Sequence, residues 1–353
     1  MKAILLKDFG PVTNFVLDEN VPMPAIGDHD ILVRIRATAF NPIDYQMRQG
    51  KTERKRMHSN ILGREFSGIV VKIGKSITLF KVGDEVFAAS GSMGSNGTYA
   101  QYISVPEDIV AIKPDHLTFG EAAAIPQGYL TALQVLTRLP VKKEDAIFIT
   151  GAAGSVGLAL VKLFLAQGYE QLLVTAGNAE SIRQLINAGL AAHQIVNYRE
   201  DDLVAKIMSM NGGALFNHSV DLVGGAMSEI CAQVIVTNGS YADVTALATP
   251  QAREGLFNKG ALIFNISNYA YSLSGNKKYY GDNLRKIALL LTENSISAPD
   301  ISILGGLSVQ TVATAHALLE RNQTQGTKLV MRIEDDEEFK ENINFYEPFA
   351  YAK

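Results

Sequence analysis

Cysteine is almost missing from this sequence, because Cys231 is the only one among 353 residues. A single cysteine excludes an intrachain disulfide and every zinc site built from several thiolates. The six histidines are scattered, and no two of them stand four residues apart. A metal site would therefore have to be assembled by the fold from distant residues. Cys231 itself is best explained as a small buried hydrophobic residue on a helix.

An excess of positive charge is missing as well, since 32 basic residues stand against 36 acidic ones and the net charge is −4. This balance gives no electrostatic support for nucleic-acid binding. No uninterrupted apolar run approaches the ~18 residues of a membrane span. The apolar run that follows Met1 is shorter than a signal peptide needs. With 47% hydrophobic and 19% charged residues, the composition predicts a globular protein of the cytoplasm.

The length exceeds what one hydrophobic core usually serves, so we expect two domains. The pattern of the chain changes near residue 125. Before that point, short β-rich runs at 31–35, 68–74 and 82–87 alternate with glycine and proline breaks. Such runs are typical of a compact β-barrel-like domain.

The region 126–268 predicts a parallel sheet that is covered by helices on both faces. The strand candidates are six short apolar runs, at 146–150, 171–176, 194–198, 220–223, 239–244 and 261–266. Helical stretches fit between the earlier strands, at 156–167, 180–188, 201–210 and 226–236. Strands that alternate with helices in this way indicate an α/β fold. Six such strands suit a doubly wound sheet that binds a dinucleotide.

A glycine-rich turn follows the first of these strands, with the sequence Thr-Gly-Ala-Ala-Gly-Ser-Val-Gly at 150–157. Against the pattern G-x-G-x-x-G it has Ala152 in the place of the first glycine. Small residues also occur in ordinary tight turns, but this run follows an apolar strand and opens a helix. Gly154 lets the backbone approach a pyrophosphate, Gly157 lets the helix press on the sheet, and the helix N-terminus favours an anion. The turn therefore predicts dinucleotide binding.

The end of the second strand indicates which dinucleotide is bound. An NAD site usually has an acidic residue there, about 20 residues past the motif. This chain has Leu-Val-Thr-Ala-Gly-Asn at 173–178 and no acid at the strand end. Asn178, Tyr198 and Arg199 are placed to donate to a 2′-phosphate, while Asn178 equally fits the N-cap of the next helix. The two roles are compatible, and we expect NADPH.

Ordered motifs recur from Met1 to about Ile333, over most of the chain. They lie at 41–44 (NPID), 63–68 (GREFSG), 82–86 (VGDEV), 97–102 (GTYAQY), 121–126 (EAAAIP), the glycine turn, 196–199 (VNYR) and 315–320 (AHALLE). Together they resemble the medium-chain dehydrogenase/reductase superfamily, and within it the zinc-free NADPH:quinone oxidoreductases of the zeta-crystallin-like branch. The resemblance implies a GroES-like catalytic domain (1–126), a six-stranded Rossmann NADP-binding domain (127–268) and a return segment (269–353). It also implies a homodimer.

The resemblance assigns roles to individual residues. The catalytic candidates are Asn41, which matches an asparagine that lines the nicotinamide site, with Asp44 and Tyr45 beside it. The cofactor-binding candidates are Asn41, Thr131, Ala153, Gly154, Ser155, Val156, Gly157, Gly177, Asn178, Tyr198, Val223, Val244, Phe264 and Ile266. No metal ligand is expected, because zinc-dependent relatives have a cysteine in the place of Asn41 and a histidine in the place of Arg64. Polarisation of a carbonyl would then come from hydrogen-bond donors or water.

Two positions depart from the family pattern. The lysine that commonly follows the 2′-phosphate turn is Ser181 here, with Arg183 two residues later. The family tyrosine after the asparagine motif is displaced, so that Tyr45 directly follows Asp44. Asp44 itself fits a proton relay or, more simply, a buried helix cap.

The function that the resemblance implies is transfer of reducing equivalents from NADPH to a quinone or another conjugated carbonyl. The alternatives are a reductase of enones, enals or enoyl thioesters, and a non-catalytic NADPH-binding protein. The basic run at 51–56 is best explained as a solvated loop. The end of the chain, 334–353, is expected to be an acidic tail followed by aromatic residues that dock on this subunit or on a neighbour.

Overall fold

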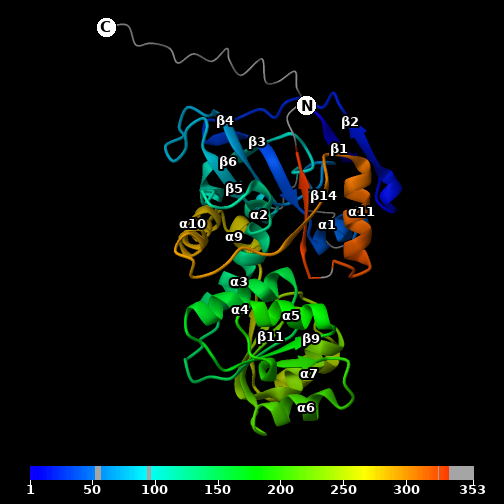
Figure 1. Cartoon of the computed structure of the whole chain (residues 1–353), viewed down its shortest axis with the longest axis vertical. Coiled ribbons are helices and arrows are strands. Elements are labelled where there is room, and N and C mark those ends of the chain that lie inside the picture. Colours follow the sequence, from blue (N-terminus) through cyan, green and yellow to red (C-terminus); the bar gives the residue numbers. More distant parts are fainter. Residues whose placement is uncertain (52–56, 94–96, 325, 334–353) are drawn as a thin grey trace.

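The computed structural model describes residues 1–51, 57–93, 97–324 and 326–333. It shows two lobes, one built mainly of antiparallel strands and one around a parallel sheet, with α3 lying between them (Figure 1). The basic residues at 52–56 and the tail at 334–353 lie outside the described residues, so the interpretations of these two segments stay predictions.

Before the chain enters the parallel lobe, the α-helices and strands of the first lobe are β1 (Ala3–Leu6), β2 (Phe15–Asp18), β3 (Asp30–Ala39), α1 (Pro42–Arg48), β4 (Phe66–Ile73), β5 (Glu85–Ala88), β6 (Tyr102–Pro106), β7 (Val110–Ile112) and α2 (Phe119–Ala123). The parallel lobe contains α3 (Pro126–Arg138), β8 (Ile147–Ile149), α4 (Ser155–Ala166), β9 (Leu172–Ala176), α5 (Ala179–Asn187), β10 (Ile195–Asn197), α6 (Leu203–Met210), β11 (Phe216–Asp221), α7 (Ala226–Val234), β12 (Ile235–Asp243), α8 (Pro250–Asn258) and β13 (Leu262–Asn265). The chain then returns through α9 (Tyr269–Leu273), α10 (Lys278–Thr292), β14 (Ile301–Gly305), α11 (Val309–Glu320) and β15 (Lys328–Arg332).

The parallel sheet has six strands in the order β10-β9-β8-β11-β12-β13. Every pair of neighbours in it is parallel. The chain moves outward from β8 to β10 and then crosses back to β11, so the strand order reverses between β8 and β11. In open α/β sheets, ligands bind at such a reversal, beyond the carboxyl ends of the strands. The predicted doubly wound α/β fold is confirmed.

The second large sheet joins segments from both ends of the chain. Its order is β14-β15-β3-β4-β5-β7, and β6 also pairs with β3. β15 lies antiparallel to β3, with Val330 opposite Ala39. The backbone N–H of Phe40 also donates to the carbonyl of Leu329 (3.0 Å). This pairing brings the residues at the start of β15 beside the loop that leads from β3 into α1.

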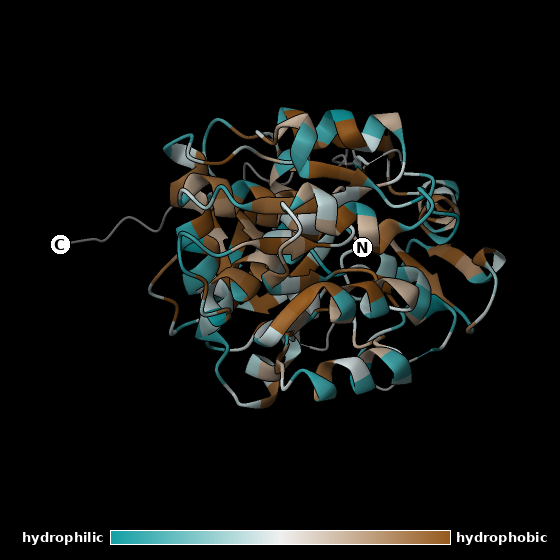
Figure 2. Ribbon diagram, turned by 90° about the horizontal axis from the view of Figure 1, so that it is seen from below, coloured by the Kyte–Doolittle hydropathy of each residue, from teal (hydrophilic) through white to brown (hydrophobic). Residues whose placement is uncertain are grey.

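Hydrophobic residues gather on the strands inside the molecule, and the outer helices carry hydrophilic residues (Figure 2). Ile147, Phe148 and Ile149 of β8 are completely buried, as expected for a central strand that is covered on both faces. The lobe limits at 126/127 and 268/269 stay a prediction, although all strands of the parallel sheet lie between them.

Three details of the parallel lobe differ from the expected pattern. β11 begins at Phe216 rather than 220, because the polar residues at its start have partners: Asn217 Oδ1 accepts from the N–H of Ala146 (2.9 Å) and the buried His218 contacts Asp145 (2.9 Å). β12 begins at Ile235 rather than 239 and contains Asn238 at a positive φ of 60°. α8 was not expected at all. It begins where Thr249 caps the N–H of Ala252 (3.0 Å).

Candidate functional site

The glycine turn lies between β8 and α4, at the carboxyl end of the sheet. Gly154 is the N-cap of α4 with extended backbone (φ −78°, ψ 169°). A Cβ on Gly154 would meet only the carbonyl oxygen of Gly151, at 3.3 Å. A Cβ on Gly157 would lie 2.5 Å from the Cα and the carbonyl oxygen of Ala152. Gly157 is therefore required by helix packing, whereas Gly154 leaves space on the side where the helix N-terminus favours an anion.

A buried aspartate holds the neighbouring loop at the strand reversal. Asp221, the last residue of β11, accepts from the Thr150 hydroxyl (2.9 Å) and the Tyr241 hydroxyl (2.8 Å). It also accepts from the backbone N–H groups of Val223 (3.0 Å) and Gly224 (2.9 Å). The carboxylate thus fixes the loop that carries Val223 to Thr150, at the start of the glycine turn.

The end of the second strand has the features expected of a 2′-phosphate position. Asn178 caps α5, with its Oδ1 accepting from the N–H of Ser181 (2.8 Å), so its amide nitrogen remains a donor. A Cβ on Gly177 would lie 2.3 Å from the Tyr198 hydroxyl oxygen, which places the phenol directly against this turn. Tyr198 is 41% exposed. Arg183 differs, because it already donates to Glu180 through Nε (3.0 Å) and Nη2 (2.5 Å).

Three of the remaining cofactor candidates lie at or just past strand ends, and the fourth is on α3. Phe264 is in β13 and Ile266 follows it, and Val244 directly follows β12. Thr131 is on α3, where its hydroxyl donates to the carbonyl of Gln127 (2.8 Å) and accepts from Asn268 Nδ2 (3.0 Å). Because the strands are parallel, these ends meet at one edge of the sheet.

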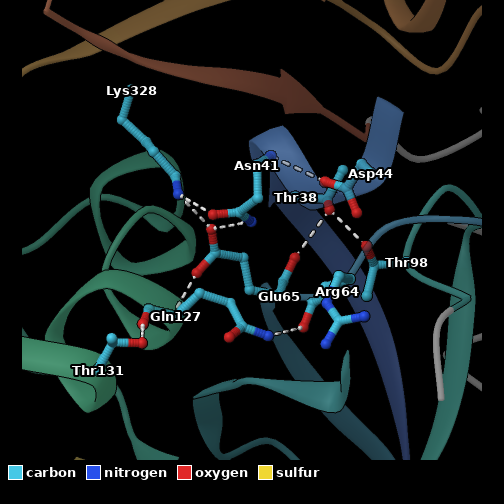
Figure 3. Close-up of polar contacts among 9 residues, drawn as sticks. All are labelled: Thr38, Asn41, Asp44, Arg64, Glu65, Thr98, Gln127, Thr131 and Lys328. Atoms are coloured by element: carbon cyan, nitrogen blue, oxygen red, sulfur yellow. Dashed lines mark hydrogen bonds and ion pairs between the residues drawn. The ribbon is translucent and has the colours of Figure 1, made fainter. Parts of the chain in front are cut away.

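On the other lobe, Asn41 has its side chain in a buried polar cluster with Glu65 and Lys328 (Figure 3). Asn41 Nδ2 donates to Glu65 Oε1 (2.8 Å), and Lys328 Nζ donates to Asn41 Oδ1 (2.6 Å). Lys328 Nζ is also 2.7 Å from Glu65 Oε1, in an ion pair with side chains only 4% and 0% exposed. We call these three residues the Asn41 cluster.

The second carboxylate oxygen of Glu65 connects the Asn41 cluster to the parallel lobe. Glu65 Oε2 accepts from the backbone N–H of Gln127 (2.7 Å), in the first turn of α3. One residue later, a Cβ on Gly128 would lie 2.6 Å from the Ser155 hydroxyl oxygen, at the start of α4. A short series of contacts therefore runs from Asn41 through Glu65 and α3 to the glycine turn.

Asp44 is completely buried on α1 and acts as the expected helix cap, with Oδ2 accepting from the Asn41 backbone N–H (2.8 Å). Burial raises the pKa of Asp44 from 3.8 to about 7, against the opposing effect of the Arg64 guanidinium. Burial, and then the charge of Asp44, also raise the pKa of Tyr99. The Tyr99 hydroxyl lies 3.1 Å from His316 Nε2. Burial lowers the pKa of His316 to about 3, so this imidazole is neutral at physiological pH.

The two positions at which zinc-dependent relatives are expected to have ligands are otherwise engaged. Arg64 donates through Nη2 to the carbonyl of Gly91 (2.7 Å), and Asn41 is bonded to Glu65 and Lys328. Within the described ranges, no group of three or more His, Cys, Asp or Glu side chains is arranged to hold a metal ion. Tyr45 is partly exposed on α1, next to Asp44.

Glu65, Lys328 and Asp221 were not expected to be site residues. Glu65 was noticed only as part of a family motif, and Lys328 begins an apolar strand 287 residues after Asn41. For Glu65 and Lys328, one feature of the sequence could have indicated a buried role. Each is a charged residue next to apolar strand residues, and a charge that is buried needs a partner.

Comparisons with known proteins agree with this architecture. Residues 27–115 match the model of the alcohol dehydrogenase GroES-like domain. Human quinone oxidoreductase is 31% identical over 213 residues, which are 60% of this chain and 63% of the human protein. The match thus spans less than two thirds of that relative's length. The NADPH-dependent alkenal/one oxidoreductase of Arabidopsis thaliana chloroplasts is 26% identical, covering 94% of this chain and 80% of the relative.

Among solved structures, the quinone oxidoreductase from Coxiella burnetii superposes with a TM-score of 0.79 at 27% identity, over 95% of this chain and 99% of that one. The two-sheet architecture, the GroES-like match and these relatives confirm the resemblance that the motifs suggested. These findings support placing the chain in the medium-chain dehydrogenase/reductase superfamily, in its quinone oxidoreductase branch.

Proposed function

We propose that this protein is an oxidoreductase that transfers reducing equivalents from NADPH to a quinone or a similar conjugated carbonyl. The observation that carries the proposal is the series of contacts from Asn41 through Glu65 and α3 to Ser155 of the glycine turn. This series connects a polar amide of one lobe to the glycine turn of the other. The human relative, at 31% identity, is named a quinone oxidoreductase, and the Arabidopsis relative, at 26%, an NADPH-dependent alkenal/one oxidoreductase.

The residues of the parallel lobe fit a dinucleotide. The open side of Gly154 and the N-terminus of α4 would receive the pyrophosphate, with backbone donors from Ala153, Ser155 and Val156. Gly157 keeps α4 close to the turn. When bound, the nicotinamide supplies a hydride from its C4 atom. Thr131, Val223, Val244, Phe264 and Ile266 are proposed to border the nicotinamide end.

NADPH rather than NADH is proposed because no acid stands at the end of β9 to repel a 2′-phosphate. The donors are the amide nitrogen of Asn178 and the exposed hydroxyl of Tyr198, beside Gly177. Arg199 lies near them, with its guanidinium carbon 5.9 Å from the centre of the Tyr198 ring. Arg183 contributes less, since its pairing with Glu180 competes with any phosphate.

Asn41 is proposed to donate an N–H of its amide to the reacting partners, with Asp44 and Tyr45 beside it as the other catalytic candidates. Hydrogen-bond donors at fixed positions stabilise negative charge that develops on a carbonyl oxygen. We propose that no zinc takes part. The ammonium of Lys328 already lies between Glu65 and Asn41, and a guanidinium and an amide are poor zinc ligands.

Two other functions remain alternatives. A reductase of enones, enals or enoyl thioesters is favoured by the Arabidopsis relative, which matches 94% of this chain where the human relative matches 60%. A non-catalytic NADPH-binding protein would keep the glycine turn and need no chemistry at Asn41.

Oxidation of NADPH by the purified protein, measured against a panel of quinones, enones and enals, tests these functions. We expect turnover with quinones, and NADPH oxidation only with enones or enals would select the first alternative. Tight NADPH binding with no turnover on any acceptor would select the binding protein. The Gly154→Val variant is the matched control, since it should lose turnover while it keeps the fold.

A homodimer and a cytoplasmic location are further parts of the proposal. β13 is an edge strand of the parallel sheet, and its Leu262 and Ile263 are 54% and 48% exposed. An exposed apolar edge invites pairing with a second copy of the strand. In the part of the chain that the structure describes, no helix is long and apolar enough to cross a membrane. Cell fractionation tests the location.

A further inference from the structure

The amide of Asn41 can take only one orientation in the Asn41 cluster. An ammonium group donates and never accepts, so Lys328 Nζ must face the amide oxygen. An ionised carboxylate accepts and never donates, so Glu65 Oε1 must face the amide nitrogen. A rotated amide would put nitrogen against the ammonium and oxygen against the carboxylate, and both contacts would be repulsive. The ion pair thus holds Asn41 by charge as well as by shape.

This arrangement uses one of the two hydrogens on Nδ2. The first is donated to Glu65 at 2.8 Å, and the geometry fixes the direction of the second. Asn41 is only 8% exposed, so few other groups compete for that hydrogen. Without the ion pair, an isolated asparagine would rotate and present either an oxygen or an N–H to a ligand.

Glu65 also links this orientation to the seating of α3. Its Oε1 serves Asn41 and Lys328, while its Oε2 accepts from the Gln127 N–H at 2.7 Å. Both oxygens are therefore used, and a shift of α3 relative to β15 would strain the bonds at Asn41. The cluster unites the loop between β3 and α1, the residue before β4 and, 287 residues after Asn41, the start of β15.

We propose that Lys328 and Glu65 are positioning residues that orient the Asn41 amide, so that its free N–H points toward the reacting groups. The inference rests on the proposed function for its catalytic consequence, but the orientation itself is a property of the protein alone. The two levels are tested by separate measurements.

The variant that tests the orientation is the pair Lys328→Met with Glu65→Gln. Removing Lys328 alone would leave an unpaired buried carboxylate and risk unfolding, whereas removing both charges is often tolerated. A matched control is Lys113→Met with Glu85→Gln. Lys113 is equally buried, with its side chain 3% exposed and Nζ 3.0 Å from Glu85, and it lies outside the site.

The first measurement is the ¹⁵N-resolved NMR signal of the Asn41 side-chain amide in the protein without cofactor, identified by its loss in Asn41→Ala. We expect two well-separated hydrogen signals in the parent, one of them protected from solvent exchange by its bond to Glu65. The double variant should bring the two signals together and speed exchange, while the Lys113/Glu85 control leaves them unchanged. An Asn41 amide that is the same in parent and double variant would overturn the proposal.

The second measurement uses kinetics with any acceptor that the parent reduces. Removing a donor to a developing charge costs about 10²–10³-fold in kcat, so a misdirected donor should cost roughly tenfold with KM for NADPH little changed. In the Asn41→Ala background the double variant should cost nothing further, because its effect acts through Asn41. Fully additive losses would overturn the positioning role. If no acceptor is reduced at all, the proposed function fails, and the NMR result alone decides the orientation.

Discussion

The Gly154→Val variant tests whether the open space at the glycine turn is needed for folding or for binding a ligand. The backbone at Gly154 (φ −78°, ψ 169°) lies in a region that any residue adopts. The only close contact of an added Cβ is the carbonyl oxygen of Gly151 at 3.3 Å, which requires a shift of a few tenths of an ångström. Valine is a poorer N-cap than glycine, by about 1 kcal/mol. We therefore expect Tm to fall by only a few degrees.

The effect on the cofactor should be much larger. A branched side chain at this position occupies the space through which backbone N–H groups would meet the pyrophosphate. Loss of two hydrogen bonds to a charged group costs roughly 3–6 kcal/mol in total. That loss corresponds to an increase in Kd for NADPH of about 10²–10⁴-fold.

Calorimetric titration with NADPH measures Kd, and circular dichroism measures Tm of the same samples. Gly157→Ala is the contrasting variant, because its Cβ would lie 2.5 Å from backbone atoms of Ala152 and force α4 off the turn. That variant should lose stability first and affinity only as a consequence. If Gly154→Val binds NADPH as tightly as the parent, the pyrophosphate does not lie at this turn and the cofactor site is wrong.

Four further predictions follow from the same structure. Asn178→Asp should lower kcat/KM with NADPH much more than with NADH, and an unchanged ratio would place the 2′-phosphate elsewhere. Asp44→Asn should become steadily more stable than the parent as the pH rises from about 4 to about 7, because over this range the unfolded parent loses the Asp44 proton while the folded parent, with its pKa raised to about 7, keeps it. Urea unfolding at both pH values checks this, and a constant difference would contradict it. Elemental analysis should find no stoichiometric zinc, and chelators should leave activity unchanged, whereas one zinc per chain would refute the ligand argument. Ile263→Lys should convert a dimer to a monomer in light scattering, and a parent that is already monomeric would refute the role of β13.

The parallel lobe could be predicted from the sequence because its strands are buried on both faces. Runs such as 146–150 contain β8, and the turn signals after them mark the start of each helix. The prediction was wrong where polar residues sit inside a strand. Asn217 and His218 hide the start of β11, since their partners at Ala146 and Asp145 come from another part of the sheet. Local patterns do not contain that information.

The position of Asn41 could be predicted from its motif, but the surroundings that give it a direction could not. Lys328 reaches Asn41 only because β15 pairs with β3, and strand pairing across nearly the whole chain leaves no periodic signal in the sequence. The same holds for Asp221, whose partners just after β8 and on β12 depend on the strand order. A sequence motif can predict a residue that is proposed to contact a ligand, whereas the residues that hold it in place become visible only once the strand pairing is known.

The charges of the Asn41 cluster also explain why burial of Asp44 is tolerated. Asp44, Arg64, Glu65 and Lys328 lie within one electrostatic neighbourhood, because the pKa of Asp44, which burial raises overall, is also lowered by Arg64 and Lys328 and raised by Glu65. Two cations face two carboxyls there, so loss of the Asp44 proton leaves the group nearly neutral rather than positively charged. A zinc ion would add two positive charges to this space, and in the described part of the chain the single cysteine, Cys231, lies on α7 in the other lobe. We therefore interpret Asn41, Arg64 and Lys328 as one electrostatic arrangement, in which an ammonium holds an amide where zinc-dependent relatives are expected to hold a metal.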